Sequence, residues 1–107
     1  MARKTSRNKV DPRFHDLWDR FTVMRNYSRQ NSAAVRDMVE WKRLMGGWGS
    51  FVTACVARNV NRDGIQALDA LVAMVQRKLA EGTDAHENAE MIRHVTLIRE
   101  AVVPLLG

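Results

Sequence analysis

Apolar residues recur along most of this chain at spacings of three and four, which is the period of an amphipathic helix. The first such stripe holds four residues: Phe14, Leu17, Phe21 and Met24. Asp11 precedes the stripe as an N-cap candidate, and Pro12 sits at the first helical position, where a missing N–H costs nothing. The pattern therefore predicts a first helix over residues 12–26.

A polar segment over residues 26–31 (NYSRQN) breaks this pattern, and Ser32 is placed to cap a second helix. We expect the second helix to end at Gly46 and Gly47, which form the strongest helix breaker in the chain. A loop is expected there, followed by a short third helix over residues 49–58.

The clearest periodicity lies in the last third of the chain. One stripe follows a polar turn at residues 59–64 and consists of Ile65, Leu68, Leu71, Val72, Val75 and Leu79. A second stripe consists of Ala89, Ile92, Val95, Ile98 and Val102. Thr83 is an N-cap candidate for the last helix, and Pro104 is expected to end or kink it. Two successive long helices predict an antiparallel hairpin.

The fold class predicted from these patterns is all-α, because no alternating strand pattern reaches five residues with turn signals on both sides. We expect a compact bundle of about five short helices. Residues 1–11 are expected to form a flexible basic arm, and residues 12–107 a single helical domain. A chain of 107 residues can bury one core but cannot enclose a deep, separately walled active site.

The charge of the chain is unevenly distributed. The 17 Lys and Arg against 12 Asp and Glu give a formal net charge of +5. Residues 1–62 hold 13 of these cations and 5 of the acids, a net +8, whereas residues 63–107 are at −3. Arginine outnumbers lysine 13 to 4, which favours forked contacts to phosphate or carboxylate. This asymmetry indicates a polyanionic partner.

We therefore predict a nucleic-acid-binding protein, for DNA or RNA, that contacts phosphates through its basic N-terminal half. The C-terminal helices would serve as scaffold or dimer interface. The candidate contact residues are Arg3, Lys4, Arg7, Lys9, Arg25, Tyr27, Arg29, Arg36, Lys42 and Arg43. Within them Tyr27 is interleaved with Arg25 and Arg29, a run suited to backbone contact and base stacking. An ordinary solvated basic surface is the alternative.

A helix-turn-helix over residues 38–57 is a further alternative, although the turn at residues 46–49 is longer than usual. The rival class is a protein-interaction module, an adaptor or inhibitor that binds a larger protein or nucleoprotein complex. Trp48 stands between glycines and either folds back on the core or serves as an exposed interface anchor. A third class is a structural subunit of a ribonucleoprotein.

The last helix carries apolar residues beyond one stripe: Met91, Leu97, Ala101, Val103, Leu105 and Leu106. A helix that is apolar over more than half its circumference is either central in its own fold or covered by a partner chain. A homodimer therefore remains an alternative.

Catalysis and metal binding receive little support from the residues. Cys55 is a lone cysteine on an apolar face, and a buried structural role is expected. His86, Glu90 and His94 share a helix side, but no further ligands accompany them, and a solvated face is expected. Phosphate-binding loops and paired carboxylates are missing. We expect no enzyme activity, cofactor or metal, no membrane association, and a cytoplasmic protein.

Overall fold

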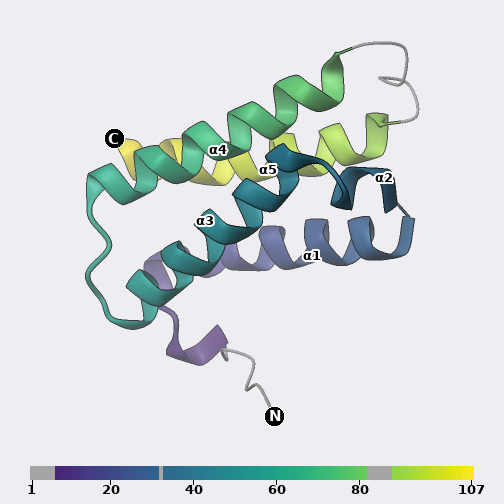
Figure 1. The fold of residues 1–107 in the computed structure, drawn as a ribbon. Helices are drawn as coiled ribbons and strands as arrows, with labels where there is room; N and C mark the ends of the chain where they lie inside the picture. The colour runs from purple at the N-terminus through teal and green to yellow at the C-terminus, as the bar shows by residue number, and fades with distance from the viewer. Residues whose placement is uncertain (1–6, 32, 82–87) are drawn as a thin grey trace.

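Five α-helices form within residues 7–31, 33–81 and 88–107, which are the parts of the chain that this computed structural model describes. Two short 3₁₀ turns, Arg7–Lys9 and Pro12–Phe14, precede them. The helices are α1 (His15–Asn31), α2 (Ala33–Arg36), α3 (Val39–Val56), α4 (Arg62–Ala80) and α5 (Ala89–Leu106). The predicted all-α fold class is confirmed (Figure 1).

The helices pack in the spatial order α1, α5, α4 and α3. Helix α5 packs against α1 and α4, and α4 packs against α5 and α3. Helices α4 and α5 run in opposite directions side by side, as the predicted antiparallel hairpin requires (Figure 1). Of the apolar residues beyond the predicted stripe of α5, Met91 is buried inside this chain, whereas Val103 is exposed.

An aromatic cluster joins α1 to α3. The rings of Phe21 and Trp48 stack almost parallel, with centroids 3.9 Å apart and planes 6° apart. One turn along α3, Phe51 meets the edge of Phe14 with centroids 5.3 Å apart and planes at 82°. These geometries are the favoured ones for aromatic pairs, which add stability beyond the area that they bury.

The glycine-rich segment 46–49 is helical, so the predicted end of a helix at Gly46 and Gly47 is wrong. A single helix, α3, runs through the segment, and one of its faces is buried at Trp41, Leu44, Trp48, Phe51 and Cys55. Each helical glycine costs roughly 1 kcal/mol relative to alanine. Burying the large apolar side chains on this face contributes more, at about 1.5–3 kcal/mol each. The helix-turn-helix over residues 38–57 is therefore also wrong, because α3 is continuous where the turn was expected.

Helix α1 extends five residues beyond its predicted end and includes the polar segment 26–31. Two of these side chains bond to the backbone of their own helix. The buried Ser28 hydroxyl donates to the Arg25 carbonyl at 2.8 Å, and the Asn31 amide donates to the Tyr27 carbonyl at 3.2 Å. A helix interruption comes later, between α2 and α3, where the backbone of Met38 is extended. Ser32 lies outside the described residues.

The remaining boundaries differ less from expectation. Helix α4 begins at Arg62, inside the predicted turn, because the Asn61 side chain accepts a hydrogen bond from the Gly64 N–H at 2.8 Å. Arg58 adopts the left-handed conformation just after α3, with φ of 59°. Helix α5 continues past Pro104 to Leu106. Thr83 and His86 lie outside the described residues.

The predicted flexible arm is packed from Arg7 onward. Arg7 forms an ion pair with Asp19 of α1 at 2.8 Å, and Val10 is a core residue with 1% of its surface exposed. The Asp11 N–H also reaches the Cys55 carbonyl at 3.4 Å. The expectation of a flexible segment up to residue 11 is thus wrong for residues 7–11, while Arg3 and Lys4 fall in the part not described.

None of the helices in the described ranges is both long enough and apolar enough to cross a membrane.

The glycines of α3 yield a matched pair of substitutions. Gly46→Ala should stabilise the protein by about 1 kcal/mol, since alanine is the better helix former and a Cβ there meets no neighbouring atom. At Gly47 a Cβ would run into the Leu71 side chain of α4. We expect Gly47→Ala to gain less stability than Gly46→Ala, by up to about 1 kcal/mol, because the Leu71 side chain must leave its packed position.

Urea unfolding followed by circular dichroism measures both variants. Equal gains in the two proteins would contradict the close approach of α3 to α4. A clear loss of stability in Gly46→Ala would contradict a helix through this segment.

Candidate functional site

A groove of about 490 Å³ lies between α1 and α3, and we call it the α1–α3 groove. Helix α1 lines it with Trp18, Thr22, Arg25, Asn26 and Arg29. Helix α3 lines it with Trp48, Gly49, Val52 and Thr53. Positions 18, 22, 25 and 29 are spaced by four, three and four, so they share one side of α1. The groove thus places two arginines next to the aromatic cluster.

The floor and width of the groove follow from the packing of the two helices. The stack of Trp48 on Phe21 joins α1 to α3. The Trp18 ring packs at a tilt against Trp48, with ring centroids 6.1 Å apart. Gly49 adds no side chain to the α3 side of the groove, and a Cβ at this position would project into open space. The groove therefore has an aromatic floor and an open rim.

The two threonines of the groove are already hydrogen-bonded within their own helices. The Thr22 hydroxyl donates to the Trp18 carbonyl at 2.9 Å, and the Thr53 hydroxyl donates to the Gly49 carbonyl at 3.0 Å. The charged donors available to a ligand belong to Arg25 and Arg29.

Arg25 and Arg29, which we call the groove arginines, are not neutralised by the described residues. Arg29 is exposed and Arg25 is half-buried, and neither forms an ion pair with any residue in the described ranges. The Arg25 Nε is buried and has no hydrogen-bond partner there. Because a guanidinium remains charged, a partly buried and unpaired one is costly, and a bound anion lowers that cost.

Positive charge without an ion-pair partner is concentrated in residues 25–62. This segment holds seven Lys and Arg against two Asp and Glu. None of the seven forms an ion pair within the described part of the chain, whereas Arg7, Arg20, Arg93 and Arg99 all do. The basic half of the chain thus divides in two, and the unpaired cations extend from the C-terminal half of α1 to the start of α4.

The other cations predicted from the sequence lie around the groove or away from it. Lys42 is seven positions before Gly49, so it lies on the same side of α3, about two turns from the groove. Arg43 lies about 100° further around α3 than Lys42, toward the side of α3 that packs on α4. Arg36 is exposed on the short α2, and Lys9 is exposed in the first 3₁₀ turn.

The structure separates Tyr27, the predicted base-stacking residue, from Arg25 and Arg29. Residues two positions apart on a helix point in nearly opposite directions, so Tyr27 faces away from the groove arginines. Its ring packs against His94 of α5, with centroids 4.8 Å apart. Burial and the nearby Arg93 lower the pKa of His94. The aromatic residue of α1 that lines the groove with these arginines is Trp18.

The expectation that Trp48 stands in a glycine-flanked loop is also wrong. The residue lies within α3, and only 6% of its surface is exposed. Its ring is stacked on Phe21, so it is not available as an exposed interface anchor. The rival class of an interaction module loses the residue that suggested it.

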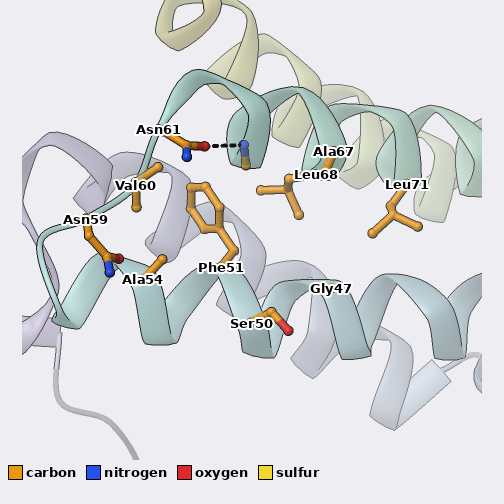
Figure 2. Close-up of a pocket in the computed structure, with 11 residues that line it drawn as sticks. Gly47, Ser50, Phe51, Ala54, Asn59, Val60, Asn61, Ala67, Leu68 and Leu71 are labelled. Carbon is orange, nitrogen blue, oxygen red and sulfur yellow. Dashed lines mark hydrogen bonds between the residues drawn. The ribbon is translucent and has the colours of Figure 1, made fainter.

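A second hollow, of about 290 Å³, lies between α3 and α4 (Figure 2). Phe51, Leu68 and Leu71 form its apolar wall, and the Leu71 side chain packs close against Gly47. The Asn61 oxygen at its edge is used to cap α4 (Figure 2). No charged side chain lines this hollow, so it offers fewer groups to a charged ligand than the α1–α3 groove does.

Metal ligands do not assemble in the described residues, which contain no group of three or more His, Cys, Asp or Glu suited to an ion. His94 and Glu90 approach to 3.6 Å, but His86 lies outside the described ranges.

Comparison of the chain with protein-family models, curated proteins and solved structures finds no match among any of the three. The geometry and charge of the α1–α3 groove therefore indicate the function.

Cys55 offers a direct test of its expected structural role. The side chain is buried in the core, and burial raises the pKa of its thiol to about 11. Since the thiolate is the reactive form, we expect the folded protein to resist a disulfide reagent near pH 8 and to react promptly once denatured. Absorbance of the released thiolate follows the reaction. Equal rates in the folded and denatured protein would contradict a buried thiol.

Proposed function

We propose that this protein is a non-enzymatic nucleic-acid-binding protein that contacts phosphates through the α1–α3 groove and the unpaired cations around it. The observation that carries the proposal is the placement of Arg25 and Arg29, without acidic partners in the described residues, beside Trp18. Phosphate is an anion that forked guanidinium groups recognise well, and neutralising phosphates releases counterions.

The layout of the helices supports this class over a sequence reader of duplex DNA. The turn that would define a helix-turn-helix is replaced by the continuous helix α3. The groove arginines supply charge, and the threonine hydroxyls beside them are bonded within their own helices. Contacts of this kind position a backbone and carry little sequence information. We therefore propose binding that depends mainly on phosphates.

Helices α4 and α5 support the site from behind in this proposal. Helix α5 packs against α1, which lines the groove. Arg20 of α1 donates to the Leu97 carbonyl of α5 at 2.8 Å, on the side of α1 away from the groove. The C-terminal half thereby holds α1 in place, and the proposal assigns it a scaffold role.

The test is a titration of labelled nucleic acid at several salt concentrations, read by fluorescence anisotropy. We expect log affinity to fall linearly with log salt. The double variant Arg25→Ala/Arg29→Ala should reduce the steepness of that line by about 1 for each phosphate that the protein no longer neutralises.

The matched control is Arg77→Ala/Lys78→Ala, which removes the same charge from α4, a helix that does not line the groove. Its salt dependence should equal that of the unmodified protein. Equal reductions in affinity for the two double variants, or no binding at low salt, would overturn the proposal. Thermal unfolding of each variant checks that the fold is retained.

A further inference from the structure

Trp18 differs in its ring contacts from Trp48, the other aromatic residue that lines the groove. Trp48 and Phe21 stack almost flat on each other, whereas Trp18 is tilted by 41° against Trp48. The side chain of Trp18 is half-buried and lines the groove. Its indole N–H has no hydrogen-bond partner within the described residues. The groove therefore presents a partly open aromatic ring and an unused donor.

The two groove arginines continue from Trp18 along the same side of α1. Arg25 is seven positions further, about 10 Å along the helix axis, and Arg29 is about 6 Å beyond it. The contacts thus form a line of about 17 Å with the aromatic ring at one end and two cations at the other. That length suits a few consecutive nucleotides of one strand.

Resting on the proposed function, we infer that the α1–α3 groove binds a single-stranded nucleic acid segment, with a base against Trp18 and a phosphate at Arg25. Proteins that bind single strands combine a positively charged groove with aromatic rings on which bases stack. The partly buried, unpaired guanidinium of Arg25 is the cation best placed to receive the phosphate, because an anion beside it offsets its burial.

A duplex does not fit this arrangement. Its bases are stacked inside and offer edges rather than faces, so a duplex backbone can reach the exposed Arg29 but cannot place a base face on Trp18. Every base has a face that can stack on an indole ring, so the groove should tolerate many sequences. The ligand class is therefore a single strand of either sugar type with little sequence preference.

The experiment compares a single strand of about 12 nucleotides with the duplex of the same sequence. Both are titrated against the intact protein by fluorescence anisotropy at low salt. We expect the single strand to bind about tenfold tighter than the duplex or better. Trp18→Ala should weaken single-strand binding by about tenfold or more, because the stacking of one base is removed, and should leave duplex binding nearly unchanged.

Trp18→Phe is the matched variant, since it keeps an aromatic face and removes the indole N–H. It should retain most of the single-strand affinity that Trp18→Ala loses, which separates stacking from a purely structural effect. Thermal unfolding of both variants identifies any loss of fold, and Trp18→Phe keeps the test decisive if Trp18→Ala is unstable.

The outcomes separate this inference from the proposed function. Equal binding of single strand and duplex, with no effect of either Trp18 variant, overturns the single-strand inference and leaves the proposed function standing. Absence of binding to both nucleic acids at low salt overturns both. Polyglutamate that competes as well as the single strand overturns the inference in favour of an acidic protein partner.

Discussion

The flat stack of Trp48 on Phe21 is the contact on which the path of α3 and the proposed site depend. It joins two helices that are far apart in the sequence, and it requires α3 to be helical at Trp48. The helix must then pass through three glycines, each of which disfavours it by roughly 1 kcal/mol. The buried apolar face from Trp41 to Cys55 outweighs that cost.

The same stack creates the groove that we propose as the functional site. Holding α1 against α3 at Phe21 leaves Trp18, Arg25 and Arg29 along one side of the contact. The glycines then acquire two different roles. Gly47 allows the Leu71 side chain of α4 to come close to α3, and Gly49 leaves the groove open on its α3 side. The segment that resembles a breaker in the sequence is therefore a packing surface on one side and a groove wall on the other.

The charge layout was partly predictable. The sequence places an excess of cations in residues 1–62, and the unpaired cations of residues 25–62 lie in this half. Which cations are unpaired could not be read from it, because Arg7 pairs with Asp19 twelve residues away and Arg20 reaches Leu97 and Glu100. The position of Trp18 on the same side of α1 as the groove arginines could in principle have been predicted. Its spacing from Thr22, Arg25 and Arg29 is helical, but only if residues 26–31 are recognised as part of α1.

Local patterns in the sequence were enough to specify the all-α class, the long hairpin of α4 and α5, and most of the core. Periodicity encodes these features, since each stripe of apolar residues needs only its own helix to be recognised. Three features were settled only by the folded arrangement: α3 is one helix, Trp48 is buried, and Trp18 rather than Tyr27 lies beside the groove arginines. Each of these depends on a contact between distant helices, whose packing free energy outweighs the local preferences of glycine and polar residues.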